Sequence, residues 1–405
     1  MKILKNIGSA FKSFFKDLGN VFRKNIRDYG MYIALVTIFI FFIITTGGRF
    51  ILPRNMFNLI QQTGYIAVMA VGMTLIIVIR HIDLSVGSIA GFVGAILAVL
   101  VVTFNLPVIL AIPIVLAIGL LAGLLSGYLV AKIGIPAFVA TLGGMFAYKG
   151  LIFNTLQSTG TLGINDPIIK AIGSGTIPSI AIIGGFHLLT IILGVVAIVL
   201  FIFSEIKTRK ERIKYRFEVL STNLFIAKLA FIGLIVMAIT LLLASYKGFS
   251  WTLIIVLVVV AVYHFLTNKT VLGRHIYAVG GNPDAAELSG ISVKKITYIV
   301  FGSMGLLSAM GGIMFLARLS SATFTAGEGL ELSVIAAAFV GGTSAAGGVG
   351  KVTGSIIGAL VMASLINGMQ MMSLGSNVQN IVSGIILVSA VIFDVKTRNM
   401  KKIEV

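Results

Sequence analysis

The stretch "PVILAIPIVLAIGLLAGLLSGYLVA", residues 107–131, contains no charged side chain. A helix needs about 20 mostly apolar residues to cross roughly 30 Å of hydrocarbon, so this stretch predicts a membrane-spanning helix. Similar runs follow one another along the chain, in which 58% of the 405 residues are hydrophobic and 11% are charged. Soluble domains carry about 25% charged residues. Because β-barrel alternation is absent, the sequence predicts an all-α polytopic membrane protein.

The hydrophobic runs predict a bundle of about 10–12 transmembrane helices. The segment 332–346 is short and Gly-rich, and two runs meet at the charged "RHIDLS" (80–85), so both regions are candidates for broken or re-entrant helices. The predicted transmembrane domain covers 31–395, after a basic amphipathic helix at 1–30 and before a tail at 396–405. Its predicted spans lie near 31–47, 60–80, 84–103, 107–131, 136–154, 179–204, 223–244, 251–267, 296–317, 332–346, 352–371 and 377–394.

The positions of Lys and Arg predict the orientation, because cytoplasmic loops carry the excess of these residues. With the N-terminus inside, 25 of the 31 basic residues fall on the cytoplasmic side, and the exceptions are Arg49, Arg54, Lys149, Lys170, Lys247 and Arg318. Both termini and the segment 273–295 are then expected in the cytoplasm. The N-terminal helix is either a signal that sets this topology or a helix lying on an anionic inner leaflet. The basic loop 205–218 has the same two readings.

Several kinds of chemistry are excluded. The chain has no Cys, its four His are scattered, and no nucleophile, base and orienting group stand in a recognisable array. The segment "GGTSAAGGVGKVTGS" (341–355) fails the spacing of a P-loop, with Ala345 and Val352 at two of the required positions. We therefore expect no enzyme activity, metal or cofactor, and an energy source on a partner. Gly341 and Gly342 suit close helix packing, or an unwound stretch that borders a translocation path.

Few acidic residues lie within membrane depth, where each is costly and hence a functional candidate. Asp83 and Ser85 in "IDLSVGS" (82–88) either cap the following helix or line the path or its gate. Glu328 and Glu331 are expected on an outer loop, where they contact a solute-delivering protein or are simply solvated. This scarcity argues against an ion-coupled secondary transporter or channel, which stays open as the alternative.

The segment "NPDAAELSG" (282–290) specifies a short cytoplasmic helix. Asn282 is a good N-cap, Pro283 suits the first helical position, Asp284 faces the positive end of the helix dipole, and Gly290 fits a left-handed stop. The helix would have about two turns and be about 10 Å long. So short a helix is marginal alone, because nucleation is costly, and we expect it to be held by packing.

The middle of this segment offers a docking face. Ala285 and Ala286 present little bulk to a groove, while Glu287 and Leu288 supply one charged and one apolar contact. The alternative is an ordered loop with no further role.

The motif "DAAELSG" (284–290) resembles the coupling segment of ABC importer permeases, which is Glu-Ala-Ala, three residues, Gly, with Asp284 in place of Glu. Its wider context resembles the monosaccharide branch of those permeases, the ribose, xylose and methyl-galactoside type. The stretches 82–88 and 331–369 are similar to the same branch, although Ser333 stands where that branch often has Asp. The pair of spans around 179–244 looks most like the xylose members.

The resemblance implies a bacterial inner-membrane subunit that dimerises and imports a monosaccharide, xylose or a related aldose. It further implies an extracytoplasmic sugar-binding protein and a separate cytoplasmic ATPase with two nucleotide-binding domains. Carried over by position, the residues seated in the ATPase would be Asn282, Asp284, Ala285, Ala286, Glu287 and Gly290.

Overall fold

The computed structural model describes residues 26–217 and 219–403, so most of the predicted N-terminal amphipathic helix lies outside the described residues. The chain forms two compact units. Among the described residues, one contains Ile51–Phe57, Thr176–Phe249 and residues 26–30, and the other contains Met31–Phe50, Asn58–Gly175 and residues 250–403. The described elements are almost all helices, which confirms the predicted all-α class.

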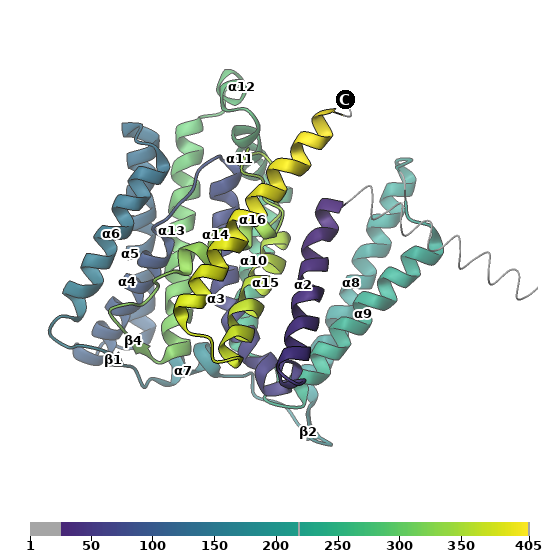
Figure 1. Ribbon diagram of the computed structural model, residues 1–405, viewed down its shortest axis with the longest axis horizontal. Coiled ribbons are helices and arrows are strands. Elements are labelled where there is room, and N and C mark those ends of the chain that lie inside the picture. Colours follow the sequence, from purple (N-terminus) through teal and green to yellow (C-terminus); the bar gives the residue numbers. More distant parts are fainter. Residues whose placement is uncertain (1–25, 218, 404–405) are drawn as a thin grey trace, which may run out of the picture. The chain divides into compact units, whose positions relative to one another are not determined.

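The second unit holds most of the helices and one small sheet (Figure 1). Its sheet pairs β1 (Leu162–Gly163) with β4 (Ser321–Ala322) antiparallel. Two helices, α2 (Ile26–Thr45) and α3 (Pro53–Val78), begin in residues of the first unit and continue into the second. The remaining helices are α4 (Val86–Ala98), α5 (Val108–Tyr128), α6 (Ala137–Leu156), α7 (Pro167–Ser174), α10 (Trp251–Lys269), α11 (Val271–Gly281), α12 (Pro283–Leu288), α13 (Val293–Leu319), α14 (Leu330–Val340), α15 (Val352–Met371) and α16 (Ser376–Ile403).

The first unit is a helical hairpin with a two-stranded ribbon. Its helices are α8 (Leu188–Lys214) and α9 (Thr222–Ala244), and its strands are β2 (Ile182–Ile183) and β3 (Phe186–His187). Glu205 of α8 and Lys228 of α9 form an ion pair of 2.9 Å across the hairpin.

Nine helices among the described residues are long and apolar enough to cross a membrane. Each corresponds to one of the predicted spans. The predicted spans at 31–47 and 332–346 match shorter apolar helices, Gly30–Thr45 and Leu330–Val340, and the one at 136–154 matches α6, which is not among the nine. At about 1.5 Å per residue, the 11 residues of α14 cannot cross the hydrocarbon alone.

Glycines let the central helices of the second unit touch backbone to backbone. A Cβ added at Gly123 of α5 would overlap the carbonyl oxygen of Phe301, and one added at Gly305 of α13 would overlap that of Gly119. In lipid the hydrophobic effect does not hold helices together, so association depends on van der Waals contact, and small residues allow the backbones to approach closely. The long helix α13 is therefore fixed at the centre of the unit by direct contact with α5.

One of the two regions singled out by the sequence, 80–85, is a place where helices break, whereas the other, 332–346, begins within α14. After α3 the chain is non-helical up to Ser85, before α4 begins at Val86, and after α13 it is largely non-helical from Ser320 to Gly329, before α14 begins at Leu330. The two breaks meet, because a Cβ added at Gly87 would lie 2.5 Å from the carbonyl oxygen of Gly327. Within these stretches Asp83, Ala322 and Gly327 are buried, whereas Arg80, Ile82 and Glu328 are exposed.

Candidate functional site

The short helix α12 forms as its sequence predicts. The Asn282 side chain accepts a hydrogen bond of 3.1 Å from the amide of Ala285, and Pro283 is the first helical residue. Gly290 adopts the left-handed conformation, with φ of +81°, just after the helix ends. Within the second unit, α12 and the C-terminal end of α16 lie at one end, and α7, β1 and β4 lie at the other (Figure 1).

One face of α12 is open and the other packs on its own chain. Leu288 is 91% exposed, and Asp284, Ala285 and Glu287 are also exposed. Ala286 is only 4% exposed. The sequence placed two alanines on the docking face, but only Ala285 is exposed to a partner. Ala286 is buried, because so short a helix is stabilised by packing one face against the rest of the chain.

Directly beneath α12 lies a junction of three chain segments, the ends of α3 and α11 and the loop 341–351. The Arg80 side chain crosses from the end of α3 to the end of α11, where its Nε donates to the carbonyl oxygen of Gly280 over 2.7 Å and its Nη2 donates to that of Gly281. The amide of Gly348 donates to the carbonyl oxygen of Val78 over 2.9 Å. The residues just before α12 are thus bound to the end of α3.

The junction is closed by backbone contact and one tyrosine. A Cβ added at Gly280 would overlap the carbonyl oxygen of Val78, so no larger residue fits there without a shift. The hydroxyl of Tyr277 donates to the carbonyl oxygen of Gly350 over 2.6 Å. Burial raises the pKa of Tyr277, which keeps the hydroxyl a proton donor.

Arg80 occupies a backbone position that usually belongs to glycine. Its φ is +65°, its amide donates to Ile77 O over 2.9 Å, and the amide of His81 donates to Ile76 O over 3.0 Å. This is the Schellman pattern of a helix C-terminus, in which the left-handed residue is commonly Gly. An arginine in this conformation is strained, and its side-chain hydrogen bonds to Gly280 and Gly281 are the feature that a glycine could not supply. Sequence reasoning counted Arg80 only as one of the basic residues that set the topology. The signal it missed is that no glycine follows the apolar run that forms α3, although helices commonly end at one.

The loop 341–351 is also tied to α16. Asp394, 4% exposed, accepts from the hydroxyl of Ser344 over 3.0 Å and from the amide of Ala345 over 3.1 Å. A Cβ added at Gly341 would lie 2.5 Å from the carbonyl oxygen of Gly354, so the end of α14 is in close backbone contact with α15. Gly342 makes the turn that follows, with φ of +89°. Asp394 went unnoticed in the sequence because it sits at the end of a long apolar run.

The first broken helix begins beside a buried acid. Asp83 Oδ1 accepts from both the amide and the hydroxyl of Ser85, over 2.8 and 2.6 Å, and Asp83 is 1% exposed. The expectation that these side chains accept from the first free amides of the helix was wrong, because Ser85 gives no side-chain cap and Asp83 closes a turn before α4. Asp83 Oδ2 has no hydrogen-bond partner among the described residues.

The second broken helix begins beside another buried acid. Glu331 is 9% exposed, and its Oε2 lies 2.5 Å from where a Cβ of Gly87 would be. Glu328 stays outside, 56% exposed at its side chain, and pairs with Lys149 over 3.2 Å. The two acids differ because α14 starts at Leu330, so that Glu331 is already within the packed helix.

The sequence carried a sign of this arrangement. Asp-Leu-Ser-Val at 83–86 and Glu-Leu-Ser-Val at 331–334 are near copies, and each stands at the start of a broken helix. Discontinuous helices whose N-termini converge are a recurrent way of building polar sites inside transporters.

Substitutions of Asp83 are expected to separate folding from transport. Asp83→Ala removes the acceptor of two buried hydrogen bonds, at about 1–3 kcal/mol for each unsatisfied donor, and should lower the yield of folded protein and its unfolding temperature. Asp83→Asn keeps an acceptor oxygen and should fold, while transport falls if the carboxylate lines the path. Size-exclusion profiles and solute uptake measure the two effects. Unchanged folding in the alanine variant would contradict the buried geometry.

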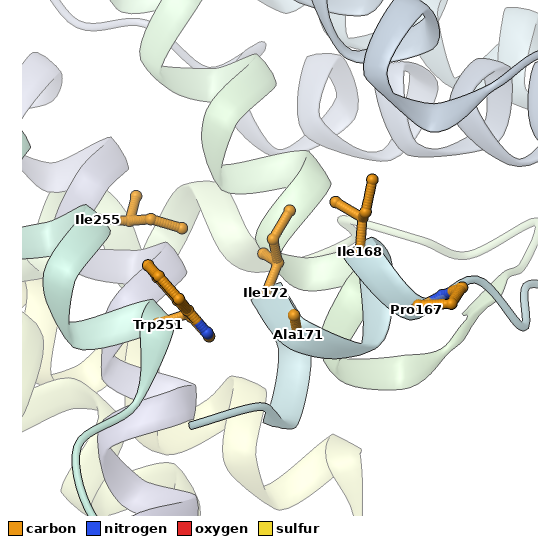
Figure 2. A pocket seen from close by; sticks show the side chains of 6 residues that line it. All are labelled: Pro167, Ile168, Ala171, Ile172, Trp251 and Ile255. Carbon is orange, nitrogen blue, oxygen red and sulfur yellow. The ribbon is translucent and has the colours of Figure 1, made fainter. Parts of the chain in front are cut away.

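One hollow in the second unit is a poor site for a polar solute. It has a volume of about 370 Å³ between α7 and the start of α10, and it is lined by Pro167, Ile168, Ala171, Ile172, Trp251 and Ile255 (Figure 2). The indole nitrogen is the only polar side-chain atom among these residues. A binding site for a hydrophilic ligand needs several polar groups in fixed positions, and this hollow does not have them.

Comparison with known proteins supplies the family. The model of the branched-chain amino acid transport system permease component matches residues 55–391. The chain belongs to this permease family. It is 38% identical to the xylose transport system permease protein of Haemophilus influenzae over 93% of this chain and 98% of that protein. It is 36% identical to the Escherichia coli xylose protein, over 92% of this chain and 93% of that one, and 35% identical to the Escherichia coli ribose import permease protein, over 87% and 89%. No solved structure matches.

The identity to xylose and ribose permeases confirms the resemblance to the monosaccharide branch, and the family match shows that the chain is a transport permease. Family and relatives are permease components of transport systems. The chain is thus a multi-pass membrane transport subunit and not an enzyme.

Proposed function

We propose that this chain is the membrane subunit of an ATP-driven importer of a monosaccharide, xylose or a related aldose, and that α12 is the site where a separate ATPase docks. The observation that carries the docking site is Leu288, a leucine 91% exposed on a capped helix at the end of the protein. Exposing a leucine to water is unfavourable by about 2 kcal/mol, which a partner's groove would recover. The xylose and ribose names of the relatives support the substrate class.

The proposal includes the partners that such a transporter needs. Two copies of this chain would present two α12 helices, one to each nucleotide-binding domain of the ATPase. An extracytoplasmic sugar-binding protein would deliver the sugar, and Glu328 is the acid exposed for contact with it, since Glu331 is buried. ATP-driven closure of the ATPase would then tilt the spans between two conformations, and the balance between them would gate the path.

The same proposal assigns the location. The protein would lie in a bacterial inner membrane with both termini in the cytoplasm. The common position of α12 and the end of α16 at one end of the unit supports this orientation (Figure 1). The path or its gate would include Asp83 and Ser85, in the break before α4, and Gly341 and Gly342, which follow α14.

The test is substitution of the exposed leucine. Leu288→Asp should abolish ATPase binding and ATP-driven uptake in proteoliposomes, because it places a charge where an apolar contact is expected, yet leave the unfolding temperature unchanged. Leu288→Met, which keeps an apolar side chain, serves as the matched control. Normal uptake by Leu288→Asp would remove α12 from the docking role. Uptake by wild-type protein driven by an ion gradient without any ATPase would instead favour a secondary transporter.

A further inference from the structure

The basic tip of the α8–α9 hairpin contains a pocket lined by residues of both helices and of the segment between them. The first part of α8, residues 188–204, has no charged side chain, whereas 205–216 holds six Lys or Arg and two Glu. The change from apolar to basic places this tip at the boundary between hydrocarbon and water on the side where basic residues gather. A topology signal requires only that basic residues be present. Here Arg209 is also held in a fixed position by contacts with neighbouring side chains.

Arg209 is the most constrained of these residues. Its guanidinium lies 4.5 Å from the centre of the Phe225 ring, and its Nη2 donates to the hydroxyl of Thr222 over 3.2 Å. Its Nη1 is buried and has no hydrogen-bond partner among the described residues. The ring contact and the bond to Thr222 hold the guanidinium in place, and Nη1 remains as a donor without an acceptor in the described part of the chain. Such a guanidinium is preorganised to bind an anion.

The surroundings define the size and charge of that acceptor. Arg209 and Arg212 line a cavity of about 80 Å³. One water takes about 30 Å³ of liquid, so the cavity has room for a group the size of a phosphate. Glu205 and Lys228, which also line the cavity, form an ion pair with each other, which leaves the positive charges of the two arginines in excess.

The apolar part of the lining indicates where the anion comes from. Val219, Leu220 and Phe225 line the same cavity, and the uncharged stretch of α8 continues from it toward the hydrocarbon. A soluble anion would gain nothing from these side chains, whereas a lipid carries a phosphate at one end and acyl chains at the other. Basic pockets between transmembrane helices at the inner surface bind lipid headgroups by this chemistry.

We propose that this pocket binds the headgroup phosphate of an anionic phospholipid, with Arg209 and Arg212 as its ligands. The bound lipid would fix the hairpin at a set depth in the inner leaflet. The site is formed by α8, α9 and the segment between them, and it does not depend on which solute is carried.

The test uses the full chain purified in detergent, titrated with dioctanoyl phosphatidylglycerol. Arg209→Gln should weaken binding at least about fivefold, while Lys210→Gln, which removes a neighbouring charge that does not line the pocket, should change it less than about twofold. If Arg209→Gln does not fold, Arg212→Gln gives the same comparison. Equal losses in the pocket and Lys210 variants would overturn the proposal, as would equal affinity for dioctanoyl phosphatidylcholine. Inorganic phosphate that binds as tightly as the lipid would reassign the pocket to a soluble anion.

Discussion

Arg80→Gly is expected to uncouple ATP hydrolysis from uptake without destabilising the protein. Glycine removes the left-handed strain at this position, which costs an ordinary residue about 1 kcal/mol, and so should offset the loss of the side-chain contacts. The two hydrogen bonds to Gly280 and Gly281 are lost, and with them the link from α11 to the end of α3. Because a charged donor contributes about 1.5–3 kcal/mol when buried and less at this partly exposed site, we expect about a tenfold fall in sugar transported per ATP.

The readout is a ratio, measured in proteoliposomes with the partner ATPase, together with the unfolding temperature. Arg80→Lys should give an intermediate ratio, since an ammonium reaches one carbonyl but lacks the fork for two. Lys132→Met is a suitable control, because Lys132 is another basic residue at a helix end, lying over Tyr128 and away from the junction. A normal ratio in Arg80→Gly would show that the junction does not transmit movement of α12. Loss of ATPase binding in all variants, Lys132→Met included, would point to a fault in the assembly and not in the junction.

Gly280→Ala is expected to have the largest effect on the structure around α12. The added methyl group would overlap the carbonyl oxygen of Val78, and since that neighbour is backbone the junction itself must open. Overpacking of this kind typically costs about 1–3 kcal/mol, and here the upper end is expected. Uptake should fall sharply, and limited proteolysis should reach the segment 273–295 faster than in the parent protein.

The neighbouring glycine provides the matched control. A Cβ at Gly281 meets nothing within 4 Å, so Gly281→Ala should be neutral or slightly stabilising in the same assays. Equal behaviour of the two alanine variants would refute close contact between α11 and the end of α3.

The features predicted correctly from the sequence depend on local chemistry. Apolar runs and the scarcity of charge predicted a helical membrane protein, and Asn282, Pro283 and Gly290 predicted α12, because caps act within one turn of the residues that make them. Of the two regions with doubtful helices, 80–85 is a break between α3 and α4, whereas 332–346 contains most of α14 and the start of the loop that follows it.

What sequence reasoning missed depends on contacts between distant segments. Arg80 and Gly280 are 200 positions apart, and Ser344 and Asp394 are 50 apart, so no local pattern connects them. The burial of Glu331 was missed for the same reason, because the loop after α13 folds back to Gly87 before α14 begins. The burial of Ala286 depends on which side of α12 meets the protein, and a helix of six residues has too little periodicity to reveal it.

The exposed leucine of α12 also bears on how the complex is made in the cell. A newly synthesised subunit carries an unsatisfied apolar side chain in water until it is covered. Under the proposed docking, the contribution of this contact, about 2 kcal/mol, exists only in the assembled complex. The same leucine would then favour assembly of the subunits, as well as serving as a contact for moving the membrane helices.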